Sequence, residues 1–201
     1  MTGVLLIRHG ESEANKQNTL VSYRGDPGLT EQGRREAKDV AKAWQRHPLV
    51  ALYASPLRRT LETASAFVRP DLPVQVDGRL HEIALGVWDG MTIPDIERTD
   101  PDRYHNWKQD PESGAPDGGE PLSAVGKRMH EFLNDMRNRH PTGLVVAVTH
   151  SDCLKATVLA TLEAPWKAAQ WFHVTNTAGI YLEWRDGHWQ MMAYPIIPGI
   201  L

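Results

Sequence analysis

The chain has 201 residues, a length that suits one domain, since domains usually hold about 100 to 200 residues. Hydrophobic residues make up 41%, and with 16 glycines the apolar share is that of ordinary globular proteins, which excludes a disordered, collagen-like or coiled-coil chain. Twenty-two basic and 25 acidic side chains give a net charge of -3, so we expect no nucleic-acid partner.

Apolar stretches such as 4–7 and 144–148 are far shorter than the roughly 18 residues that cross a membrane, and no segment resembles a signal peptide. The single cysteine, Cys153, cannot form an internal disulfide, which agrees with a reducing compartment. We therefore expect a cytoplasmic protein with no membrane partner. The sequence leaves the oligomeric state open, including a homo-oligomer.

Short apolar runs at 4–7, 51–54 and 144–148 are typical of strands buried on both faces of a parallel sheet. Near the C-terminus, two further strand patterns at 179–184 and 189–194 flank the dipeptide Asp186-Gly187, which favours a hairpin turn. The pattern therefore predicts a mostly parallel sheet with an antiparallel edge.

Helical patterns separate these strands. One follows Thr30, a candidate cap, and ends near residue 47; a second opens at Pro56 and continues to Val68. A third carries an apolar stripe over 122–136, and a fourth could be capped by Ser151 or Asp152. The alternation predicts an α/β fold: a single domain, 1–201, forming a three-layer sandwich with helices on both faces of the central sheet.

The segment 88–121 differs from the rest, because it is rich in proline, glycine, aspartate and aromatic residues with only short helical patterns at 93–98 and 102–108. Long insertions in compact α/β domains often cover a functional site, so we expect a lid. The pattern makes Tyr23, Tyr104 and Trp107 look exposed, and Trp107 and Trp171 are candidates for a substrate pocket.

Basic and imidazole side chains follow three of the expected strands. Arg8-His9-Gly10 ends the first, Arg58-Arg59 follows the second, and Thr149-His150-Ser151 ends the third. Ligands bind beyond the carboxyl ends of strands in open α/β sheets, which brings these groups to one edge. Any one of them could be a solvated strand end. Together they predict an anion site, and phosphate fits best because guanidinium groups match its oxygens and a helix N-terminus adds N–H donors.

The run from Leu5 through Arg8-His9-Gly10-Glu11-Ser12 to Asn15 resembles the RHG signature of the histidine phosphatase superfamily, which includes the cofactor-dependent phosphoglycerate mutases. Further blocks follow in the family's order over residues 4 to about 160. These blocks are Leu29-Thr30-Glu31-Gln32-Gly33, Ser55-Pro56-Leu57 with Arg59 and Thr63-Ala64, Leu80 with Glu82, Gly86, Trp88 and Gly90, Gly118-Gly119-Glu120, and Val148-Thr149-His150.

The resemblance implies that His9 is a nucleophile that forms a phosphohistidine. A neutral imidazole suits that role, and the adjacent glycine lets the backbone approach a substrate. Arg8, Arg59 and His150 would hold the phosphoryl oxygens, and Glu82 would protonate the leaving oxygen and then activate water. From its residues alone, Glu82 could equally be a solvated glutamate before a glycine turn.

Other positions are implied to bind phosphate or the rest of the substrate, namely Asn15, Ser22 and Ser151, although Asn15 could instead end a helix. Here the sequence departs from the family. Ser151-Asp152-Cys153 stands where glycine usually follows the second histidine, Ser22-Tyr23-Arg24-Gly25 stands where relatives often have Gly-Trp, and Ala14 replaces a tryptophan. These departures concern substrate choice more than the phosphoryl chemistry.

Other catalytic patterns fail. Cys153 is not followed by the arginine of a C-x5-R phosphatase, because that position is Leu159, and no nucleophile elbow, Walker loop or HExxH motif occurs. The remaining histidines show no metal-ligand spacing and are expected at the surface. They are His47, His81, His105, His130, His140, His173 and His188. We expect neither a metal nor a cofactor.

The sequence is thus interpreted as a metal-independent phosphomonoester hydrolase that acts on a small phosphorylated metabolite. Two alternatives stay open: a phosphoglycerate mutase-type phosphoryl transfer and a non-catalytic phosphate-recognition module. The mutases that this chain resembles have Glu-Arg-His-Tyr-Gly where this chain has the apolar stretch 82–86, which favours the phosphatase branch. Sugar phosphates, phosphoserine, α-ribazole phosphate and nucleotides all remain candidate substrates.

Overall fold

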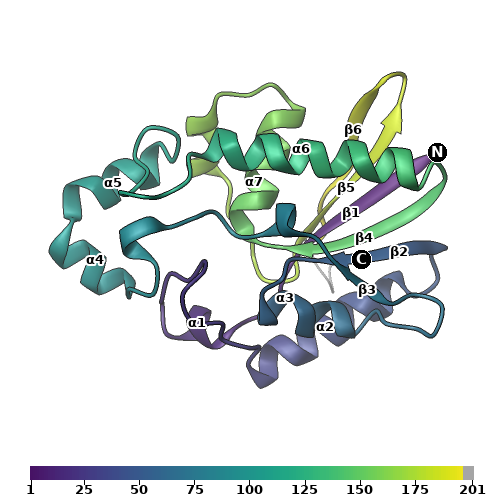
Figure 1. The fold of residues 1–201 in the computed structure, drawn as a ribbon, viewed down its shortest axis with the longest axis horizontal. Coiled ribbons are helices and arrows are strands. Elements are labelled where there is room, and N and C mark those ends of the chain that lie inside the picture. The colour runs from purple at the N-terminus through teal and green to yellow at the C-terminus, as the bar shows by residue number, and fades with distance from the viewer. Residues whose placement is uncertain (197–201) are drawn as a thin grey trace.

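The computed structural model describes residues 1–196, which form a six-stranded sheet in the order β3-β2-β4-β1-β5-β6 (Figure 1). The strands are β1 Thr2–Arg8, β2 Leu49–Ala54, β3 Val74–Val76, β4 Gly143–Thr149, β5 Gly179–Arg185 and β6 His188–Ile196. The first four strands in that order run parallel, whereas β5 pairs antiparallel with both β1 and β6. The predicted mostly parallel sheet with an antiparallel edge is confirmed.

Helices cover both faces of the sheet. They are α2 Glu31–Trp44 and α3 Arg58–Ser65 on one face, and α6 Leu122–Arg139 and α7 Ser151–Thr161 on the other (Figure 1). Because successive strand residues point to opposite faces, Val4 and Leu6 pack in the core under α6 and α7, whereas Leu5 and Ile7 pack toward α2 and α3. The continuous apolar runs of the sequence are therefore strands that are buried on both faces of the sheet.

One helix start agrees with the prediction and two differ from it. The Thr30 hydroxyl accepts the Gly33 N–H at 3.0 Å and caps α2 as expected. Helix α7, however, is capped by His150 in extended conformation, with Ser151 as its first residue, because β4 continues to Thr149 and leaves one residue to make the turn. Helix α3 starts at Arg58 rather than Pro56, since Leu57 is still extended.

The edges of the sheet contain one missed strand and one confirmed hairpin. Strand β3 has three residues and only intermediate or exposed side chains, so it produces no hydrophobic pattern in the sequence. At the other edge, Asp186 and Gly187 have φ of 51° and 85°, the left-handed pair that a two-residue hairpin with matching twist requires.

The segment 88–121 lies beyond the carboxyl ends of the strands (Figure 1). It contains the end of the 3-10 turn η2 Gly86–Trp88 and helices α4 Ile93–Thr99 and α5 Pro101–Gln109. Trp88, Ile96 and Tyr104 form a small core of its own. The expectation that Tyr104 is exposed is wrong, because its ring packs edge-on against Trp88 at 5.7 Å between centroids.

No helix within 1–196 is long and apolar enough to cross a membrane.

Three short elements complete the fold, namely α1 Glu13–Lys16, η1 Gly78–Leu80 and η3 Trp166–Trp171. The loop between β1 and α1 crosses the first turn of α2 at two glycines. A Cβ on Gly33 would lie 2.0 Å from the Glu11 carbonyl oxygen, and one on Gly10 would lie 2.5 Å from the Gly33 oxygen. Backbone-to-backbone contact without side chains therefore holds the residues next to His9 against α2.

We predict that Gly33→Ala lowers the free energy of unfolding by about 2 kcal/mol, because the new methyl group must push α2 away from that loop. Gly78→Ala is the control, since a Cβ there meets no heavy atom within 4 Å. Urea denaturation of both variants measures the difference. Equal stabilities for the two variants would show that the crossing is loose.

Candidate active site

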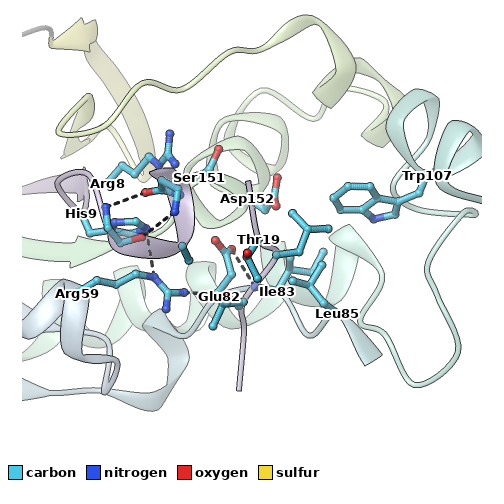
Figure 2. A pocket seen from close by; sticks show the side chains of 15 residues that line it. Arg8, His9, Thr19, Arg59, Glu82, Ile83, Leu85, Trp107, Ser151 and Asp152 are labelled. Carbon is cyan, nitrogen blue, oxygen red and sulfur yellow. Dashed lines mark hydrogen bonds between the residues drawn. The ribbon is translucent and has the colours of Figure 1, made fainter. Parts of the chain in front are cut away.

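A cavity of about 150 Å³ opens at the carboxyl ends of β1 and β4, where the sequence pattern places the anion site. Figure 2 shows Arg8, His9, Arg59 and Ser151 at one side of this cavity and Trp107 at the other. The lining also includes Asn15, Glu82 and Asp152. The structure therefore brings side chains from separate strand ends, expected to lie together, into one hollow.

His9 is buried, and its ring nitrogens have different partners. Nδ1 lies 2.8 Å from the Gly10 carbonyl oxygen, which can only accept, so Nδ1 carries the proton. The Nε2 lone pair then accepts the Arg59 Nε–H at 3.3 Å. Burial, followed by the charges of Arg59 and Arg8, holds the pKa of His9 well below its usual value. At neutral pH His9 is thus a neutral imidazole whose Nε2 lone pair accepts a hydrogen bond from Arg59.

Each of the two arginines has one bonded and one unpaired guanidinium nitrogen among the described residues. Arg8 Nη1 donates to the Val174 carbonyl at 2.6 Å, and Arg59 Nη2 donates to the Val21 carbonyl at 3.0 Å. In contrast, Arg8 Nε and Arg59 Nη1 are buried and have no hydrogen-bond partner among the described residues. Leaving a buried charged donor unpaired is costly, and an anion with several oxygens would satisfy both nitrogens at once. This pair of nitrogens forms the floor of a candidate anion site.

His150 is fully buried beside this floor. Its Nε2 lies 2.9 Å from the Ser55 hydroxyl, and its Nδ1 lies 3.3 Å from Arg59 Nη2. Burial, followed by the Arg59 charge, holds the pKa of His150 well below its usual value. Because Arg59 Nη2 can only donate, Nδ1 of a neutral His150 accepts, and Nε2 carries the proton and donates to the Ser55 hydroxyl. His150 does not line the cavity in this structure, and it must change tautomer or gain a proton at Nδ1 before it can donate to an anion.

Glu82 stands at the middle of the cavity, with only 13% of its side chain exposed. Its Oε1 accepts the Ile83 N–H at 2.9 Å, and its Oε2 lies 3.7 Å from His150 Nδ1. Burial and the nearby Asp152 charge raise the pKa of Glu82 to about 7. The alternative interpretation of a solvated glutamate is wrong. A carboxyl group with this pKa can both give and take a proton at neutral pH.

Asn15 and Ser151 line the cavity as well. Asn15 does not end a helix: it lies in α1, where its Oδ1 accepts the Ser12 N–H at 3.1 Å and an N–H of Asn176 at 3.2 Å. Ser22 is different. It is fully buried, does not line the cavity, and its hydroxyl accepts the Leu85 N–H at 3.2 Å. That position supports the loop structure and not the expected phosphate contact.

Sequence reasoning missed the clamp that holds the 22–24 loop. Asp89 accepts the N–H groups of Ser22, Tyr23 and Arg24 at 2.7, 2.8 and 2.9 Å. Tyr23, which is 64% exposed as expected, stacks on His81 with 3.9 Å between ring centroids. His81 was expected at the surface and is buried. The sequence offers one signal for the role of Asp89, namely its position between Trp88 and Gly90 in a block that resembles the family.

A second missed residue is Asn176, whose Nδ2 donates to the His9 carbonyl at 3.0 Å. It lies just before β5, far from His9 in the sequence, and no motif marks it.

Within 1–196, no three His, Cys, Asp or Glu side chains are arranged to hold a metal ion. The cationic groups that line the cavity are the guanidinium groups of Arg8 and Arg59.

We predict that Asp152→Asn lowers the pKa of Glu82 below about 7, because removal of a negative charge removes one of the two effects that raise it. A carbon-13 NMR titration of the side-chain carboxyl, assigned by its loss in Glu82→Gln, measures this value. The exposed Asp71→Asn serves as control for the change in total charge. An unchanged Glu82 pKa in Asp152→Asn would assign the whole shift to burial.

Comparisons with known proteins agree with this geometry. Residues 4–196 match the model of the histidine phosphatase superfamily, branch 1. The chain is 35% identical over 165 residues to phosphoserine phosphatase 1 of Hydrogenobacter thermophilus, covering 81% of this chain and 77% of that protein. The solved structure of Bacillus stearothermophilus YhfR has a TM-score of 0.91 and 31% identity, with 96% of each chain covered.

The phosphoserine phosphatase of Entamoeba histolytica, solved in complex with 3-phosphoglyceric acid, has a TM-score of 0.86 and 27% identity over 100% of both chains. Fold, strand-end cluster and sequence relatives thus agree over nearly the whole length described. The chain therefore belongs to branch 1 of the histidine phosphatase superfamily and is a phosphatase.

Proposed function

We propose that the protein hydrolyses small phosphate monoesters through a phosphohistidine on His9. The observation that carries the proposal is the juxtaposition of the His9 Nε2 lone pair with two buried guanidinium nitrogens, Arg8 Nε and Arg59 Nη1, that have no hydrogen-bond partner within residues 1–196. A nucleophile and an oxyanion site on the same floor are the two elements that phosphoryl transfer requires.

In the first step, Nε2 of His9 attacks phosphorus while the bond from phosphorus to the ester oxygen breaks. Glu82 gives its proton to that oxygen, and an alcohol leaves. In the second step, the Glu82 carboxylate takes a proton from water, whose oxygen attacks phosphorus, and the bond to His9 breaks. Arg8, Arg59 and His150 hold the phosphoryl oxygens, where charge spreads in the transition state. Inorganic phosphate leaves and Glu82 is again protonated.

The alternatives are weaker on this site. A non-catalytic phosphate-binding module has no need of a carboxyl group with a pKa of about 7 at the middle of its cavity. A phosphoglycerate mutase must hold the carboxylate of its substrate, whereas beyond Glu82 this cavity is lined by the Asp152 carboxylate and by apolar side chains such as Leu20 and Ile83, and Arg8 and Arg59 are the only cations among its described lining residues. Relatives named as phosphoserine phosphatases support hydrolysis.

The proposal keeps the remaining expectations from the sequence. We place the enzyme in the cytoplasm as one domain over 1–201, working on a free metabolite without a nucleic acid, a membrane or a metal. Its support is the net charge of -3 and the single cysteine, Cys153, which is buried and unpaired in the described structure. Homo-oligomer formation is tested by light scattering of the purified protein.

We predict that His9→Ala abolishes hydrolysis of p-nitrophenyl phosphate, because the substitution removes the proposed nucleophile. Wild-type enzyme quenched during turnover should carry an acid-labile, base-stable phosphate on His9, located by mass spectrometry. His130→Ala, at an exposed histidine of α6, is the control and should keep full activity. Turnover by His9→Ala at the wild-type rate would refute the phosphohistidine.

We predict that Glu82→Gln slows the hydrolysis of alkyl phosphates far more than that of p-nitrophenyl phosphate. Nitrophenolate leaves without a proton, whereas an alkoxide needs one, so the loss of a general acid should cost about 100-fold or more only for the alkyl ester. Single-turnover rates isolate the phosphorylation of His9 from its later hydrolysis. Equal losses for both esters would leave Glu82 as a residue that positions the substrate.

A further inference from the structure

This inference rests on the proposed function and concerns the alcohol that leaves. With phosphate over Arg8, His9 and Arg59, the ester oxygen faces Glu82, and the rest of the substrate extends toward the opposite wall. Figure 2 shows Asp152 between the arginine and histidine cluster and Trp107. A leaving group that follows the cavity therefore passes the Asp152 carboxylate.

A second cavity of about 290 Å³ lies beyond this point. Trp107 and Asp152 line both cavities, so these two side chains form the wall that the cavities share. Lys155 and the exposed Trp171, one of the two tryptophans considered for a pocket, line only the second. A leaving group that extends past Trp107 and Asp152 enters a space bordered by one carboxylate and by the ammonium groups of Lys155 and Lys108.

The charges of Asp152 and Lys155 are paired and largely shielded from solvent. Lys155 Nζ lies 3.1 Å from Asp152 Oδ1, with 22% and 18% of their side chains exposed. Among the described residues, Asp152 has no ion-pair partner other than Lys155. Among those residues, Glu82 and Asp152 supply the carboxylates that line the reaction cavity, and Glu82 is taken up by the ester oxygen. Asp152 is therefore the negative charge that meets the leaving group.

We propose that Asp152 makes the enzyme selective for phosphate monoesters whose leaving alcohol carries an ammonium group. The Asp152 carboxylate accepts a hydrogen bond from that group, and in a partly buried site a charge-assisted bond of this kind is stronger than a neutral one. A carboxylate placed at the same point is repelled, because like charges brought together at low solvent exposure are unfavourable. Where the alcohol also carries a carboxylate, as in an amino-acid ester, Lys155 is its partner.

Three esters with two-carbon leaving groups test the proposal: O-phosphoethanolamine, 2-hydroxyethyl phosphate and phosphoglycolate, which are positive, neutral and negative at the far end. We expect kcat/KM to fall in that order for the wild-type enzyme. The first and last should differ by about ten-fold or more, as expected for one partly buried charge contact. O-phosphoserine, which carries both charges, tests Lys155.

Asp152→Asn should compress this ranking by about ten-fold, whereas Asp71→Asn, which removes an exposed carboxylate elsewhere, should leave it unchanged. Because the comparison is a ratio between esters in each variant, a change in the acidity of Glu82 largely cancels. Lys155→Gln should slow O-phosphoserine relative to O-phosphoethanolamine. Inhibition of the wild-type enzyme by 2-aminoethylphosphonate against ethylphosphonate gives the same comparison without any variant, and the amine should bind more tightly.

The outcomes separate the two proposals. Hydrolysis of all three esters with no preference for the positive one, or the same preference in Asp152→Asn as in the wild type, would overturn the selectivity and leave the phosphatase function intact. Failure to hydrolyse these esters and p-nitrophenyl phosphate alike would overturn both. A ranking that follows charge and collapses in Asp152→Asn supports the assignment.

Discussion

Two guanidinium nitrogens are buried at the edge of the sheet without a hydrogen-bond partner in the part of the chain that the structure describes. Arg8 and Arg59 each anchor one nitrogen on a backbone carbonyl and leave another, Arg8 Nε and Arg59 Nη1, unpaired among these residues. Unpaired buried donors cost stability, and a structure keeps them only when the surrounding fold holds them in place. Burial, followed by the charges of Arg59 and Arg8, lowers the pKa of His9, which keeps the imidazole neutral. In the proposed mechanism, one arrangement thus binds the anion and prepares the nucleophile.

The fold holds this arrangement through backbone contacts. The loop after His9 lies against Gly33 of α2 at a distance that leaves no room for a side chain. On the other side, three N–H bonds to Asp89 fix the loop that follows Val21, whose carbonyl orients Arg59. Residues far from the phosphoryl chemistry therefore determine where its donors point, as catalysis by preorganised groups requires.

Glu82 and Asp152 illustrate how one charge can serve two purposes. The Asp152 carboxylate helps to raise the pKa of Glu82 into the range that suits an acid and a base at neutral pH. It also lines both neighbouring cavities. A negative charge beside the candidate anion site weakens the binding of phosphate. In the proposed mechanism this cost is offset by proton transfer from Glu82 and by the choice of leaving group.

The sequence by itself determined the sheet, its parallel centre and antiparallel edge, and the gathering of Arg8, Arg59, His9 and His150. Apolar runs, capping residues and an Asp-Gly turn are local signals, and parallel strands bring their carboxyl ends together whatever the loops do. Only the tertiary structure decided which polar groups are buried. Ser22, His81 and Tyr104 looked exposed or ligand-binding, yet each is enclosed by segments distant in the chain, and Asn176 reaches His9 from 167 residues away. Burial, and with it the pKa of Glu82 and the partners of each donor, depends on contacts between distant segments, which no local pattern in a single sequence records.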